Sequence, residues 1–231
     1  MANIATPAFL SRIRALYPIQ PSAVRNPWFI AAAVAFSASN VPEAVPLVYQ
    51  HAVREVDGVD DRLLVVRKIK DALFKSGLLS GYPKAINALV ALHNELPEEL
   101  RDKKPLRDLS RSTDALTQAG HAYFESTYGD TSASVQGLLD GAFPDLGYFS
   151  RTIGYGYVYS FSDVLGHVDT SFAMISALIA SDTPLQVGWH LRGAIRNGAS
   201  EAEVRAVRQI AIDVSSAAGI QWKHTIPNLD S

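Results

Sequence analysis

Apolar residues recur with helical spacing along nearly the whole chain. Positions i, i+3 and i+4 are apolar in successive segments, and alternating patterns of the β type are scarce. The predicted helices are 27–40, 42–56, 60–77, 82–96, 107–128, 131–142, 145–160, 166–182, 184–197 and 201–218. The pattern therefore predicts an all-α fold, a multi-helix bundle.

Prolines and glycines agree with these helices. Prolines stand near predicted helix starts, where their missing N–H costs least: Pro27, Pro42, Pro83, Pro144 and Pro184. Ser200 and Glu203 have the spacing of a capping box, and Gly198 just before them can end the previous helix. The stretch 154–159 alternates tyrosine with glycine or valine, and its pattern comes nearest to that of a strand.

Length and composition favour one domain. The chain has 231 residues, of which 48% are hydrophobic, so it can bury a sizeable core. The charged stretch 98–105 is the most linker-like segment, but it is short. We therefore expect a single all-α domain, 1–231, with an N-terminal helical half, 1–106, and a second half, 107–231.

Charge and composition also exclude several classes of function. Twenty-one basic and twenty-three acidic residues give a net charge of −2. This balance lacks the excess of basic residues that is typical of nucleic-acid-binding proteins. The absence of cysteine excludes disulfides, thiolate nucleophiles and cysteine-bound zinc. No apolar run reaches the roughly 18 residues of a membrane span. We therefore expect no membrane partner. The six histidines show no metal-binding spacing, and we expect no metal and no cofactor.

The beginning of the chain is basic. Arg12, Arg14 and Arg25 precede the first acidic residue, Glu43, as also occurs in mitochondrial transit peptides. We interpret the segment as a basic helix packed on the domain, which makes the expected location cytoplasmic, with the mitochondrion as the alternative. The final residues, Asn-Leu-Asp-Ser, match no peroxisomal or retention signal.

His190 is the main candidate for chemistry. On a helical wheel of 184–197 it lies at the edge of the apolar arc, and its neighbours Gly193 and Ala194 are small. Small neighbours leave space beside the imidazole, so His190 could act as a general base in a pocket. It could equally be a core histidine whose ring nitrogens are satisfied by the backbone.

Other candidates lie upstream of His190. Asp169 could orient the imidazole, or it could be a charge favoured by the helix dipole. Tyrosine hydroxyls can donate to a developing oxyanion, but tyrosines also pack in cores. If the segment is helical, Tyr155 and Tyr159 share a face and Tyr157 points elsewhere.

The region 145–222 resembles the carboxymuconolactone decarboxylase-like proteins, relatives of the alkylhydroperoxidase D group. The resemblance is carried by Tyr155-Gly-Tyr-Val-Tyr-Ser160, Asp169-Thr-Ser171, His190-Leu-Arg-Gly-Ala194, Asn197-Gly198, the Glu203 helix and Gly219. It implies an alkylhydroperoxidase D-like bundle that assembles into trimers or hexamers. It also places the histidine and arginine of the family on His190 and Arg192.

The sequence departs from this family at two positions. Where the bacterial decarboxylases carry a glutamate the chain has Tyr157, and where they carry an arginine it has Thr170. An arginine would be a natural clamp for a carboxylate substrate, so its loss changes the site. The thiol peroxidase activity of the wider group is excluded, because the chain has no cysteine.

The resemblance implies a cofactor-independent enzyme that transfers a proton next to a carbonyl, in a decarboxylation, a lactone isomerisation or a related lyase step. His190 would be the general acid and base, Tyr157 would donate to an enolate, and Asp169 would orient the imidazole. The expected substrate is a small carbonyl or carboxylate compound, contacted by Tyr155, Tyr159, Thr170 and Gln186. The alternative is a non-catalytic homo-oligomeric ligand-binding or scaffold protein that has lost the acid and base residues.

Overall fold

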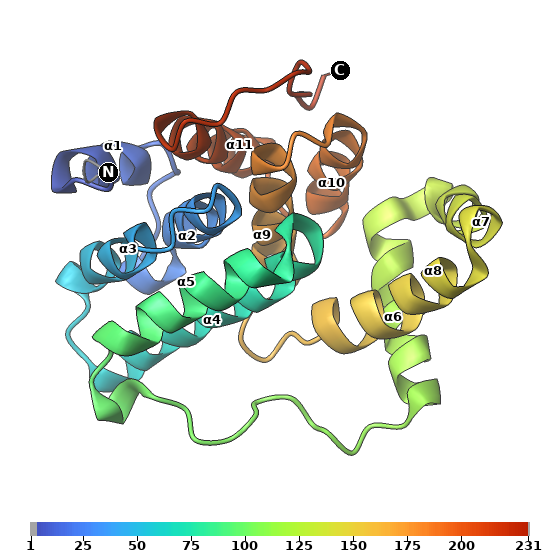
Figure 1. Cartoon of the computed structure of the whole chain (residues 1–231), viewed down its shortest axis with the longest axis horizontal. Helices are drawn as coiled ribbons and strands as arrows, with labels where there is room; N and C mark the ends of the chain where they lie inside the picture. The colour runs from blue at the N-terminus through green and yellow to red at the C-terminus, as the bar shows by residue number, and fades with distance from the viewer. Residues whose placement is uncertain (1–3, 231) are drawn as a thin grey trace.

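The computed structural model describes residues 4–230, which are largely helical and contain no strand (Figure 1). The α-helices are α1 (Pro7–Ala15), α2 (Trp28–Ala38), α3 (Ala44–Ala52), α4 (Val59–Ser80), α5 (Tyr82–Glu95), α6 (Thr113–Tyr128), α7 (Ser132–Ala142), α8 (Pro144–Tyr148), α9 (His167–Ala180), α10 (Pro184–Arg196) and α11 (Glu201–Ala217). Short 3-10 turns are η1 (Ala23–Arg25), η2 (Val53–Glu55), η3 (Glu98–Leu100) and η4 (Gly129–Thr131), and η5 (Phe149–Tyr159) is a π-helix. The predicted all-α class is confirmed.

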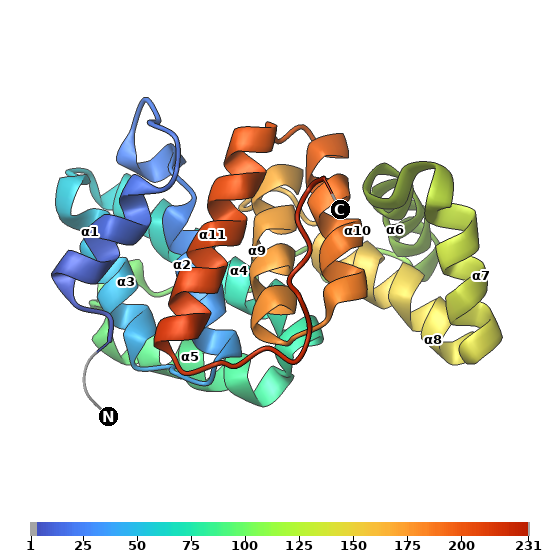
Figure 2. The ribbon, with the colours of Figure 1, turned by 90° about the horizontal axis from the view of Figure 1, so that it is seen from above.

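A large bundle surrounds α9. Helices α2, α4, α10 and α11 all pack against it, and α11, α9 and α10 lie side by side in Figure 2. Every residue of Trp28–Ala38 is buried, because this helix is apolar on all sides. The main apolar core lies between α1–α5 and α9–α11, which together we call the bundle.

A smaller unit, residues 113–159, stands beside α10, and we call it the lobe (Figure 1). It consists of α6–α8 and η5, and most of a second, mainly aromatic core belongs to it. Two glycines allow α6 and η5 to cross closely. A Cβ on Gly120 would lie 1.9 Å from the carbonyl oxygen of Arg151, and a Cβ on Gly156 would lie 2.3 Å from that of Leu116.

The two apolar cores do not follow the predicted boundary between residues 106 and 107. The main core joins residues from Ala5–Leu100 with residues from Leu165–Val214, and the lobe is inserted between these two stretches. The two cores group the helices into the bundle and the lobe. The division of the chain into the halves 1–106 and 107–231 stays a prediction.

Several local predictions can be compared with the structure. Ser200 and Glu203 form the predicted capping box, and Gly198 has the expected positive φ of 104°. The helix predicted from residue 107 begins instead at Thr113, because Ser112 caps it and Arg107 in the preceding segment reaches back to α4. The basic start of the chain forms α1, which buries Leu10 and Ile13.

Within residues 4–230, no helix combines the length and the apolar character that a membrane crossing needs. The same residues hold no cluster of three or more histidine, aspartate or glutamate side chains that could bind a metal ion.

Candidate functional site

The π-helix η5 sets the direction of the tyrosines. The predicted helix 145–160 divides into the α-helical α8 and this π segment, in which the Ser160 N–H donates to the carbonyl oxygen of Tyr155, five residues earlier, at 2.9 Å. Tyr155 and Tyr159 point to the same side, as helical spacing predicted, and both are buried. Inserted π turns occur frequently at functional sites.

A cavity of about 200 Å³ lies between the lobe and the bundle. The lobe contributes residues of α6, α7, α8 and η5, and the bundle contributes residues of α4, α9 and α10. Four of the predicted site residues line it: Tyr155, Tyr159, Gln186 and His190. These four side chains come from two segments that meet only because the lobe packs on α10 and α9.

His190 is buried, with 3% of its surface exposed, and its ring stands edge-on to Tyr128 with 5.8 Å between the ring centroids. Burial lowers the pKa of His190 to about 4, so the imidazole is neutral near pH 7. Within the described residues no hydrogen bond to this ring is formed, neither from backbone nor from side chains. A neutral imidazole keeps one donor and one acceptor for a bound molecule.

The space beside His190 has another origin than the one predicted. A Cβ on Gly193 would lie 2.9 Å from the carbonyl oxygen of Thr127. The space beside this glycine is therefore occupied by α6 and leaves no room for a ligand. Its small size lets α10 approach α6 closely. This approach brings Trp189 and His190 of α10 next to Tyr128 at the end of α6.

Tyr128 and Trp189 are among the cavity residues that were not predicted from the sequence. The Tyr155 hydroxyl donates to the Tyr128 hydroxyl at 3.1 Å, which leaves the proton of Tyr128 available to another acceptor. Burial raises the pKa of Tyr128, Tyr155 and Tyr159, so all three hydroxyls are neutral donors at physiological pH. Tyr128 and Trp189 lie in predicted helices, but no local pattern reveals that they face each other.

Three predicted site residues lie outside the cavity, and their expected roles are corrected. Asp169 accepts a hydrogen bond from Lys68 at 2.9 Å and so pairs with α4 rather than with His190. Thr170 accepts one from Lys75 at 2.8 Å in the bundle. Tyr157 lies on the other side of η5, in a separate hollow next to Arg107.

A buried ionic network links the bundle to the segments on either side of the lobe. Asp71 accepts a hydrogen bond from Arg107 at 2.7 Å, and its other oxygen lies 3.3 Å from the Lys75 ammonium, outside hydrogen-bond geometry. Lys75 donates to the carbonyl oxygen of Phe161 at 2.7 Å, and Arg107 donates to that of Val158 at 3.1 Å. Burial lowers the pKa of Lys75 to about 8. These groups all have partners within the protein, so the network fastens the lobe.

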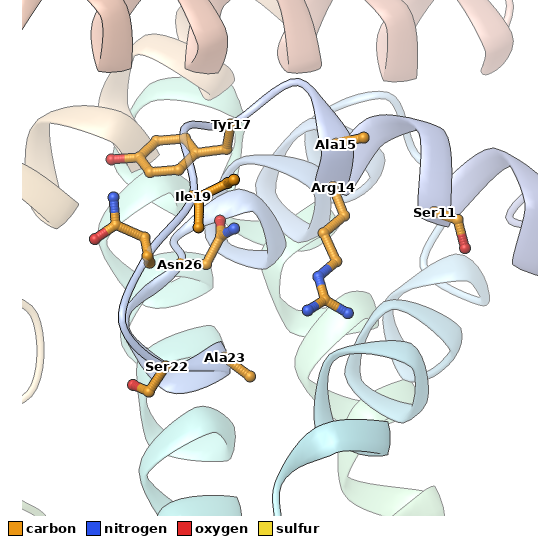
Figure 3. A pocket seen from close by; sticks show the side chains of 9 residues that line it. Ser11, Arg14, Ala15, Tyr17, Ile19, Ser22, Ala23 and Asn26 are labelled. Carbon is orange, nitrogen blue, oxygen red and sulfur yellow. The ribbon is translucent and has the colours of Figure 1, made fainter.

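A larger hollow of about 520 Å³ lies between α1 and the segment 17–26 (Figure 3). Its main polar groups are engaged elsewhere. Arg14 donates to Glu55 at 2.9 Å, and the Tyr17 hydroxyl donates to Glu203 at 2.7 Å. The cavity at His190 therefore offers the better-defined set of groups for a ligand.

Comparison with known proteins identifies the family. Peroxisomal protein 2 of Schizosaccharomyces pombe is 32% identical over 204 residues, covering 87% of this chain and 91% of that protein. The chain belongs to the Peroxisomal protein 2 family. Peroxisomal protein 2 of Saccharomyces cerevisiae is 25% identical over 264 residues, covering 89% of this chain and 93% of that protein. No protein-family model matches the chain.

These relatives correct the expected location. Both are named as peroxisomal proteins, which points to the peroxisome and contradicts the cytoplasmic and mitochondrial predictions. The basic start does form a helix that packs on the bundle, as expected, but such a helix carries no information about the compartment. The comparisons give no link to the carboxymuconolactone decarboxylase-like proteins.

Proposed function

We propose that the protein binds a small organic molecule in the cavity between the lobe and the bundle, with His190 as its polar anchor, and that it acts in the peroxisome. The observation that carries this proposal is the neutral, buried imidazole, which faces the cavity without a hydrogen bond from the described residues. An imidazole at the wall of a cavity, with no partner in the protein, can form a hydrogen bond with a bound molecule.

The size and lining of the cavity support a small ligand. A cavity of about 150 Å³ lined by apolar side chains is large enough for benzene, so about 200 Å³ takes a somewhat larger molecule. Aromatic and aliphatic side chains surround a few polar groups, which is the usual composition of a small-molecule site. The peroxisomal location rests on the names of the two relatives.

The proposal is tested by filling the cavity. A Cβ on Gly154 would meet its nearest neighbour at 3.7 Å, an ordinary contact, and Gly154→Val places this carbon and two more at the cavity wall. We expect wild type to bind 2-octanone in isothermal titration calorimetry and Gly154→Val to lose the signal. Gly137→Val is the matched control, because Gly137 on α7 has open space around it. Equal binding by all three proteins would refute the proposal.

A second candidate function is proton transfer next to a carbonyl, in the cofactor-independent reaction class expected from the sequence. The observation that favours it is the pair formed by His190 and Tyr128. Tyr128 could donate to the carbonyl oxygen, supported by the hydrogen bond that it accepts from Tyr155, while His190 takes the adjacent proton. Tyr128 thus replaces Tyr157 as the proposed donor.

Deuterium exchange tests this second function without knowledge of the substrate. We expect the protein to catalyse exchange of the protons next to the carbonyl of 2-octanone in heavy water, followed by NMR. General acid–base catalysis is worth roughly 10²–10⁴-fold, so His190→Gln should remove an acceleration of that order. Exchange at the same rate in His190→Gln would refute the catalytic proposal. The proposal that the protein binds a small molecule would still stand.

A further inference from the structure

We infer that the cavity takes an uncharged ligand, a ketone, ester or alcohol with a hydrocarbon tail, and excludes carboxylates and phosphate esters. This inference rests on the proposed function and names its ligand class. The sequence left both carbonyl and carboxylate compounds open, and the lining of the cavity distinguishes between them.

No aspartate, glutamate, lysine or arginine of the described residues lines the cavity. Its polar groups are all neutral at physiological pH: the hydroxyls of Ser150 and the tyrosines, the Gln186 amide, the Trp189 indole and the His190 ring. Moving a carboxylate from water into such surroundings is costly unless a cation or several donors meet it. An uncharged oxygen needs one or two hydrogen bonds, which His190 and Tyr128 can supply.

Three buried or half-buried cations that contact α4 or belong to it are already paired. Lys75 donates to two backbone carbonyl groups and to Thr170, Lys68 pairs with Asp169, and Arg107 pairs with Asp71. None of the three cations lines the cavity. The amino end of α10 adds partial positive charge, and Pro184 at its first position removes one of the N–H groups that could meet an anion there.

The mouth of the cavity is apolar. Leu146 and Phe149 line the cavity and are also 41% and 44% exposed, so they connect its interior to the surface of the lobe. Phe143, three residues before Leu146, is 57% exposed. A hydrocarbon tail that leaves the cavity would pass these side chains, while the oxygen-bearing end stays near His190.

Three compounds of equal chain length test the charge preference. We expect 2-octanone and 1-octanol to bind wild-type protein at least tenfold more tightly than octanoate at pH 7, by isothermal titration calorimetry. Equal affinity for octanoate would overturn the inference about charge, while the proposed function would stand. Absence of binding by all three compounds would overturn both.

A cation placed in the cavity should weaken the discrimination against carboxylates. Gln186 lines the cavity at the start of α10, so Gln186→Arg adds a guanidinium that can meet a carboxylate. We expect this variant to bind octanoate at least tenfold more tightly than wild type does. Gln118→Arg, at an exposed position of α6, is the matched control and should leave octanoate binding unchanged. An unchanged octanoate affinity in Gln186→Arg would contradict the inference.

Discussion

The Tyr155 hydroxyl donates a 3.1 Å hydrogen bond to the Tyr128 hydroxyl and so ties the π-helix to the end of α6. Both rings also pack against Phe124, with ring centroids 4.8 and 4.4 Å away. The pair forms one wall of the cavity, and His190 stands against it. The shape of the candidate site therefore depends on how the lobe itself is packed.

Tyr155→Phe should lower the free energy of unfolding by about 1 kcal/mol, because one buried hydrogen bond is lost and the ring is kept. Urea unfolding followed by circular dichroism measures the change. Tyr148→Phe removes an exposed hydroxyl from the same lobe and should be neutral. An equal effect of the two substitutions would show that the Tyr155–Tyr128 bond contributes nothing to stability.

Stability should fall in mild acid because of His190. Burial lowers its pKa from 6.5 to about 4, so between these values the unfolded chain binds a proton that the folded protein does not. The contribution, about 3 kcal/mol, is fully present above pH 6.5 and is lost as the pH falls to about 4. Burial also lowers the pKa of His51 and His167, and both act in the same direction.

His190→Gln isolates the part that belongs to this residue. The free energy of unfolding, measured in urea between pH 4 and pH 7, should depend less steeply on pH in the variant than in wild type. The same slope in both proteins would mean that His190 is not held neutral by burial.

Gly120→Ala should strongly destabilise the lobe. The added Cβ would overlap the carbonyl oxygen of Arg151, which is backbone and cannot rotate away, so α6 and η5 must separate. Overpacking of this kind costs about 1–3 kcal/mol. Gly137→Ala, in open space on α7, should be neutral or stabilising by about 0.5–1 kcal/mol, because alanine favours a helix. Thermal unfolding of the two variants gives the comparison, and equal midpoints would disprove the close crossing.

Asp71→Asn should cost about 3–5 kcal/mol, because it removes the charge that faces both Arg107 and Lys75 in a buried network. Asp230→Asn is the exposed counterpart. Asp230 pairs with Arg205 at the surface, where water and salt weaken an ion pair, so this substitution should change the stability little. Urea unfolding should separate the two variants clearly, and similar values would show that burial adds nothing to the Asp71 interactions.

The helices could be predicted because helical periodicity and capping are local. The wholly apolar α2, the capping box at Ser200 and the glycine at 198 all follow from residues a few positions apart. The π-helix could not be predicted, because α and π winding give similar spacings over one or two turns. The late start of α6 depends on Arg107, whose partner Asp71 is 36 residues away.

The sequence by itself determined that the protein is a helical bundle, that His190 borders an apolar helix face, and that Tyr155 and Tyr159 share one side. Only the tertiary structure decided that these residues meet Tyr128 and Trp189 around one cavity, and that Asp169 and Thr170 bind lysines of α4 instead. The physical reason is the distance along the sequence over which each effect acts. Periodicity fixes the direction of a side chain relative to its own helix, whereas its partner depends on how helices distant in sequence pack together.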